Sequence, residues 1–66
     1  MFQVLYVSRN GRESSPDIES IEEARKYAKE KMKEPGVTEA VILKDHPTRE
    51  GSDPIEYYGP KGHLFL

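Results

Sequence analysis

A chain of 66 residues without cysteine forms one small domain at most, and it contains neither a disulfide nor a cysteine-based metal site. The charges are dense but mixed, ten basic against twelve acidic residues, so net charge favours neither nucleic acid nor an anionic membrane. Leu, Ile, Val and Phe make up only about a fifth of the chain, close to the level below which chains stay disordered. We therefore expect a folded domain with a thin core.

The first strand is predicted at residues 1–9, MFQVLYVSR, because Val, Leu, Tyr and Phe favour extended backbone. Asn10-Gly11 is a strong signal for a two-residue turn, since both residues tolerate positive φ. A return strand at Arg12–Ser15 can follow before Pro16 ends it, but it has no apolar residue to hold it. We treat this strand as optional.

The helix is predicted at residues 20–33, SIEEARKYAKEKMK. Ser20 and Glu23 have the spacing of a capping box, and Pro35 disfavours helical backbone just beyond the end. The apolar residues of the segment fall on one stripe. The stripe consists of Ile21, Ala24, Ala28 and Met32. Its two alanines allow the helix to approach a sheet closely.

The remaining strands are predicted at residues 37–44, VTEAVILK, and 54–58, PIEYY. Residues 45–54 contain no apolar side chain apart from proline, and this predicts a solvent-exposed connection. Gly59–Gly62 fits a turn, after which HLFL, residues 63–66, forms a short final strand or a docked tail.

These elements predict a single α+β domain, residues 1–66, of order β-(β)-α-β-β-(β). One helix packs on one face of a three- to four-stranded, mostly antiparallel sheet. A right-handed crossover through the helix would leave the strands at 1–9 and 37–44 parallel. We place the strand at 54–58 between these two, which makes every neighbouring pair antiparallel.

The second face of this sheet is also apolar. The first strand presents Leu5 and Val7 on the side opposite Val4 and Tyr6, whereas a face in water should be more polar. One helix covers one face, so we expect a second copy of the chain, or another protein, on the other. The interface candidates are Tyr57, Tyr58, Phe65 and Leu66. The leading hypothesis is a small non-enzymatic interaction module of accessory, regulatory or inhibitor type that self-associates.

The alternative hypothesis is a nucleic-acid or anion-binding domain, in which turn cations converge beside an exposed tyrosine. Its contacts would be Arg9, Arg12 and Arg49, with Lys44 and Lys61. An enzyme ranks third, because no nucleophile elbow or phosphate-binding glycine motif is present.

His46 and His63, with Asp45, Glu50 and Asp53, match no metal-ligand spacing. We therefore predict no cofactor, no metal and no catalytic residue. The run Val4–Val7 is too short for a secretory signal or a membrane span, so we expect a soluble cytoplasmic protein with no membrane partner.

Overall fold

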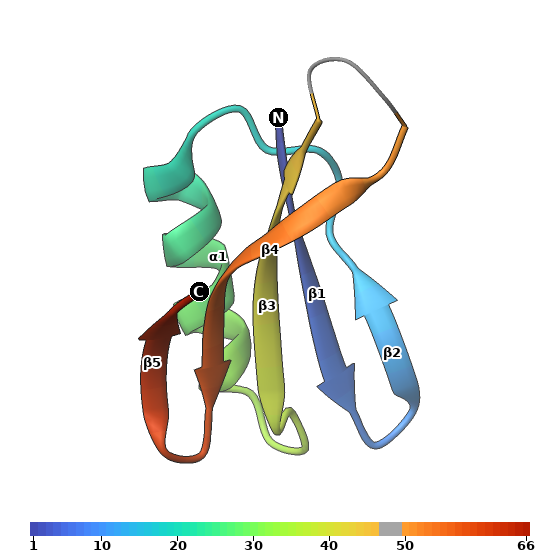
Figure 1. Ribbon diagram of the computed structural model, residues 1–66. Coiled ribbons are helices and arrows are strands. Elements are labelled where there is room, and N and C mark those ends of the chain that lie inside the picture. The colour runs from blue at the N-terminus through green and yellow to red at the C-terminus, as the bar shows by residue number, and fades with distance from the viewer. Residues whose placement is uncertain (47–49) are drawn as a thin grey trace.

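The computed structural model describes residues 1–46 and 50–66, and in these residues five strands form one antiparallel sheet with a helix on one face (Figure 1). The sheet order is β2-β1-β3-β4-β5. The elements are β1 Phe2–Ser8, β2 Gly11–Ser14, α1 Ile21–Met32, β3 Glu39–Asp45, β4 Ser52–Gly59 and β5 Gly62–Phe65. The predicted α+β class and element order are confirmed, and both optional strands form.

The return strand β2 is held by backbone groups and by Ser15, not by apolar side chains. Gly11 adopts φ +108° in the turn, and β2 begins there, one residue earlier than predicted. The Ser15 N–H donates to the Val4 carbonyl at 2.8 Å, and the Ser15 Oγ accepts from the Val4 N–H at 2.8 Å. Because Ser15 is only 4% exposed, these bonds are shielded from competing water.

Helix α1 has the boundaries and the buried stripe that the sequence predicts. The Ser20 Oγ accepts from the Glu23 N–H at 3.1 Å, which caps the first turn. Ala24 and Ala28 are fully buried against the sheet. The chain leaves the helix through Gly36, whose φ of +90° favours glycine.

The predicted strand order was wrong in two respects. β1 and β3 are antiparallel neighbours rather than parallel strands, and β4 lies outside β3 rather than between it and β1. The reason is β2, which reverses the chain before the helix. The crossover therefore joins β2 to β3, and these two run parallel on either side of β1.

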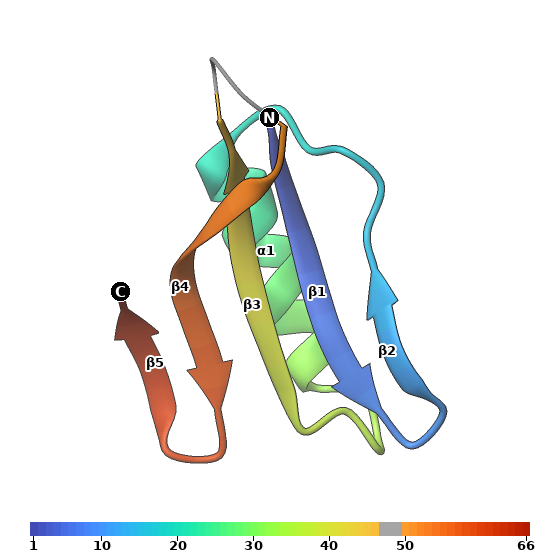
Figure 2. The ribbon, with the colours of Figure 1, turned by 45° about the vertical axis from the view of Figure 1, so that its right-hand side comes forward.

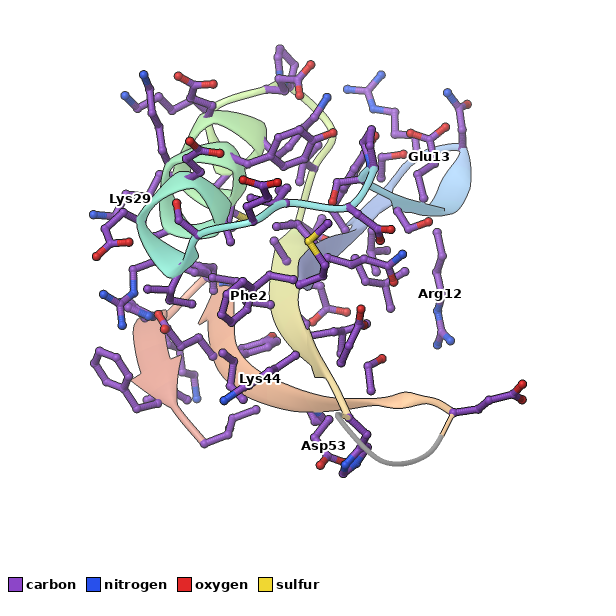
Figure 3. All side chains as sticks on the ribbon, turned by 90° about the horizontal axis from the view of Figure 1, so that it is seen from above. Phe2, Arg12, Glu13, Lys29, Lys44 and Asp53 are labelled. Carbon is purple, nitrogen blue, oxygen red and sulfur yellow. The ribbon has the colours of Figure 1, made fainter. Side chains whose placement is uncertain are left out.

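The core lies between α1 and the facing side of β1, β3 and β4. Its buried members are Val4, Tyr6, Ala24, Ala28, Ala40, Ile42 and Tyr58. Phe2 packs against this cluster on the helix side, as the view from above shows (Figure 3). The small alanines on both layers bring the helix close to the sheet.

The connection between β3 and β4 is shorter than predicted. β3 continues to Asp45, which pairs with Ser52, and Pro54 pairs with Leu43 beyond an irregularity in register after Ile42. Residues 47–49 lie outside the described part of the chain, and the predicted anion contact Arg49 is among them.

Substitutions on the two sides of α1 test this packing. Ala28→Glu places an unpaired carboxylate in the fully buried layer, so we expect it to lower the free energy of unfolding by several kcal/mol, about 3 or more. Lys26→Glu, on the exposed side, should cost less than about 1 kcal/mol. Urea unfolding followed by circular dichroism measures both. Equal losses would show that the wrong side of the helix has been assigned to the core.

Candidate functional site

Figure 2 is viewed towards the face of the sheet opposite α1, which is here called the free face. The strand register places a continuous band of apolar side chains on this face. Leu5 pairs with Val41, Val41 with Tyr57, and Tyr57 with Leu64, so the four lie in one row across β1, β3, β4 and β5. Val7 and Leu43 flank the row, two residues along their strands. The apolar band is defined as Leu5, Val7, Val41, Leu43, Tyr57 and Leu64.

Polar residues border the apolar band. Val7 pairs with Arg12 on one side and with Glu39 on the other, while Leu43 pairs with Gln3. In the view from above, Arg12 points to the free side of the sheet and its neighbour Glu13 to the helix side (Figure 3). The band therefore has a defined edge along β2 but reaches β5 without interruption.

Tyr57 lies flat within the apolar band. Its hydroxyl donates to Glu39 Oε2 at 2.6 Å, and this hydrogen bond, followed by desolvation, raises the pKa of Tyr57. The ring passes over Gly59, where a Cβ would come within 2.6 Å of it. The absence of a side chain at Gly59 thus allows the Tyr57 ring to cover the sheet. The Tyr57 hydroxyl is hydrogen-bonded to Glu39.

The most exposed apolar side chains gather at β5. Leu64, Phe65 and Leu66 are 57%, 72% and 70% exposed. Leu64 belongs to the free face, whereas Phe65 pairs with Glu56 and lies on the helix side of the same edge strand. The expected position of Phe65 on the free face was therefore wrong. Exposed apolar residues that follow one another at the end of an edge strand are typical of a contact surface.

An ion pair between the buried Glu56 and the partly exposed Arg25 fixes β5 from the helix side. Glu56 is 2% exposed, and its carboxylate accepts from Arg25 Nε at 2.9 and 3.1 Å and contacts Arg25 Nη2 at 2.9 Å. His63 Nε2 lies 2.6 Å from Glu56 Oε1, and the His63 ring stacks on Tyr58 at 4.1 Å. These residues, Arg25, Glu56, Tyr58 and His63, are here called the Glu56 cluster.

The electrostatics of the Glu56 cluster keep the carboxylate ionised. Burial alone would raise the pKa of Glu56. The hydrogen bonds from Arg25 and His63, together with the charges of both, have the larger effect, so the pKa of Glu56 is lowered from its ordinary value of 4.5. The same hydrogen bond raises the pKa of Arg25. The Tyr58 hydroxyl is buried without a hydrogen-bond partner among the described residues, and desolvation raises its pKa.

The Glu56 cluster anchors a strand, and of its four residues Arg25 also lines a hollow of the surface. A shallow hollow of about 450 Å³ runs along the outer side of α1, and a smaller one of about 200 Å³ adjoins His46. Neither is lined by Glu56 or His63. The smaller volume is below the roughly 300 Å³ at which ligand pockets begin.

The structure corrects the position of Tyr58. This residue was expected on the free face, but it is 6% exposed and belongs to the core under α1. Of the adjacent tyrosines, Tyr57 is the one on the free face. Sequence alternation shows that the two oppose each other but not which one faces the helix, because the irregularity after Ile42 resets the register.

The described cations do not converge. Arg12 stands at the β2 edge of the free face, Arg9 lies against Gly36 beyond the helix, and Lys44 is at the opposite end of the sheet (Figure 3). Lys61 lies in the β4–β5 turn, on the other edge from Arg12. Four strand spacings, roughly 19 Å, separate those edges.

The two histidines lie apart, and each contacts a carboxylate. His46 Nε2 is 2.6 Å from Asp53 Oδ2, near the β3–β4 connection, while His63 belongs to the Glu56 cluster. Within residues 1–46 and 50–66, no group of three or more His, Asp or Glu side chains could hold a metal ion.

Comparison with protein-family models, curated proteins and solved structures gives no match to this chain. Nor does the described part of the chain contain a helix that is long and apolar enough to cross a membrane.

The pH dependence of stability tests the Glu56 cluster. Because the folded pKa of Glu56 lies below its unfolded value, the ionised carboxylate stabilises the fold above about pH 4.5, and this contribution is lost as the pH falls through the folded pKa. Glu56→Gln should therefore cost about 1–3 kcal/mol near pH 7. The difference in the free energy of unfolding between Glu56→Gln and the unchanged protein should narrow as the pH falls below about 4.5.

Urea unfolding at a series of pH values measures this difference. Glu30→Gln, at an exposed position on α1, is the matched control and should follow the unchanged protein throughout. Parallel stability curves for Glu56→Gln and the unchanged protein would contradict the assigned role of the carboxylate.

Proposed function

We propose that this chain is a small non-enzymatic protein-interaction module, of accessory, regulatory or inhibitor type, that self-associates through the side of the sheet left free by α1. The observation that carries the proposal is the apolar band, which crosses four strands and ends at the exposed Leu64. Phe65, on the helix side of the same strand, and Leu66, next in the chain, are exposed beside it. Monomeric proteins seldom leave a contiguous apolar surface of this kind uncovered.

A second copy of the chain fits this surface because the β5 end of the apolar band is the uncharged side chain of Leu64. A two-fold contact brings identical patches together, so charged patches repel each other and apolar patches do not. The side chain of Leu64 can therefore meet its counterpart without like-charge repulsion. A different protein docking at the same place is the competing outcome. The cytoplasmic location expected from the sequence stays a prediction.

The alternative of nucleic-acid or anion binding has less support. Among its proposed arginine contacts that the structure describes, Arg12 lies on the free face and Arg9 packs against Gly36. The hydroxyl of Tyr57, the tyrosine on that face, is engaged by Glu39. A salt titration with DNA and RNA separates the two hypotheses, because phosphate contacts weaken steeply with salt. Tight binding at low salt that Arg12→Ala weakens would favour this alternative.

Mass in solution tests self-association. We expect light scattering to give a mass that rises from 7.6 kDa towards twice that value as the concentration increases. Leu64→Asp should keep the mass at 7.6 kDa, since it places a carboxylate at the exposed end of the apolar band. Lys26→Glu changes charge on the outer side of α1 and serves as control. A mass of 7.6 kDa for the unchanged protein up to millimolar concentration would exclude the homodimer.

A further inference from the structure

The outer edge of β5 presents unpaired backbone groups. The Leu66 N–H donates to the Ile55 carbonyl at 3.0 Å, so Leu66 directs its backbone hydrogen-bonding groups towards β4. Hydrogen-bonding direction alternates from residue to residue along an antiparallel strand. The backbone groups of Leu64 therefore also point towards β4, whereas the N–H and C=O groups of His63 and Phe65 point away from the sheet. Two residues of β5 are thus ready to pair with another strand.

The other edge of the sheet, β2, is protected against pairing with its own copy. The Ser15 N–H donates to the Val4 carbonyl, so by the same alternation Arg12 and Ser14 direct their backbone groups outward. Antiparallel self-pairing of β2 about Glu13 would place two Glu13 carboxylates opposite each other, and like charges in that position destabilise a pair. On β5 the corresponding central residue is Leu64, which is uncharged, so self-pairing of β5 brings no like charges together.

We infer that two copies of the chain join edge to edge, with β5 of one copy antiparallel to β5 of the other and the two-fold axis at Leu64. The inference rests on the proposed self-association, but it moves the contact from the middle of the free face to the β5 edge of the sheet. His63 of each copy then lies opposite Phe65 of the other, and their outward groups form about four backbone hydrogen bonds. The two Leu64 side chains meet at the axis as a non-hydrogen-bonded pair, in which side chains approach most closely.

This arrangement keeps equivalent faces together. A two-fold axis perpendicular to the sheet leaves both helices on one side and both free faces on the other. The two apolar bands therefore join at Leu64 into one band across both copies. On the helix side, the Phe65 ring, 72% exposed in the single chain, gains the His63 ring of the second copy as a neighbour.

The Glu56 cluster prepares β5 for this contact. His63 is held by the Glu56 carboxylate at 2.6 Å and by stacking on Tyr58, and Arg25 lies 5.8 Å from the centre of the Phe65 ring. A strand that is already fixed loses little conformational entropy on pairing. The edge is short, however, and its interface falls below roughly 1,200 Å², so we expect dissociation constants in about the micromolar to millimolar range.

Cysteine cross-linking tests the position of the two-fold axis. The chain contains no cysteine, so Leu64→Cys introduces a single thiol. A non-hydrogen-bonded antiparallel pair has Cα atoms about 4.5 Å apart, within the range that a disulfide spans. Mild oxidation should convert Leu64→Cys to a covalent dimer of twice 7.6 kDa. Glu13→Cys, the equivalent central position on the β2 edge, is the matched control and should remain largely uncross-linked.

Proline at position 65 tests the hydrogen bonds themselves. Phe65→Pro removes an outward N–H that the β4–β5 ladder does not use, and an edge strand tolerates proline there. Phe65→Val loses the ring but keeps the N–H. We expect the proline variant to stay at 7.6 kDa at concentrations where the valine variant still dimerises. Circular dichroism and melting temperatures of both variants show whether they are folded. If the proline variant is unfolded, cross-linking of Leu64→Cys still tests the position of the two-fold axis.

The other outcomes overturn the inference in distinguishable ways. Val41→Lys lies in the middle of the apolar band, two strands away from the edge, and should leave the dimer intact. If Val41→Lys dissociates the dimer and Phe65→Pro does not, the two copies stack through their free faces. That result would contradict the edge-to-edge geometry and keep the proposed self-association. A mass that grows without limit indicates β5 pairing with β2 of the next copy, which also excludes the two-fold contact. A monomer at every concentration removes the proposed function together with the inference.

Discussion

The width of the sheet exceeds what α1 can cover, and this constraint shapes the rest of the molecule. Twelve residues of helix extend about 18 Å and pack on β1, β3 and β4. The strands at the two flanks, β2 and β5, receive no apolar layer from the helix, and every residue in both is exposed. Something other than hydrophobic burial has to hold them in place.

Each flank is held by a buried polar residue. In the part of the chain that the structure describes, the buried polar residues are Ser15 and Glu56. Ser15 ties the end of β2 to Val4 of β1 through two hydrogen bonds, and Glu56 ties β5 to the helix through His63 and Arg25. Buried polar groups are costly unless they are paired, and here the pairing serves to attach the edge strands.

The two flanks differ in what they offer to a partner. β2 carries Arg12 and Glu13 along its edge, which protects it against pairing with other strands. β5 carries Leu64 and Phe65 and continues the apolar band of the free face to the rim of the sheet. The proposed association is therefore directed to one edge by the distribution of charge, while backbone hydrogen bonds supply the contact.

Local patterns in the sequence determined the helix, its cap at Ser20, its buried alanines and the positions of the main strands, because these depend on residues close together in the chain. An apolar second face was also visible from the alternation of β1. Strand order was decided only in the tertiary structure, since the short polar strand β2 reverses the chain without an apolar signal.

The Glu56 cluster likewise arises from residues distant in sequence. Arg25 and Glu56 are 31 positions apart, and nothing in either local pattern links the helix residue to the strand residue. Which of Tyr57 and Tyr58 is buried depends on a register irregularity after Ile42. Side-chain alternation is fixed locally, but the face that each side chain meets is decided by which strands pair and in what register, and that is a property of the whole fold.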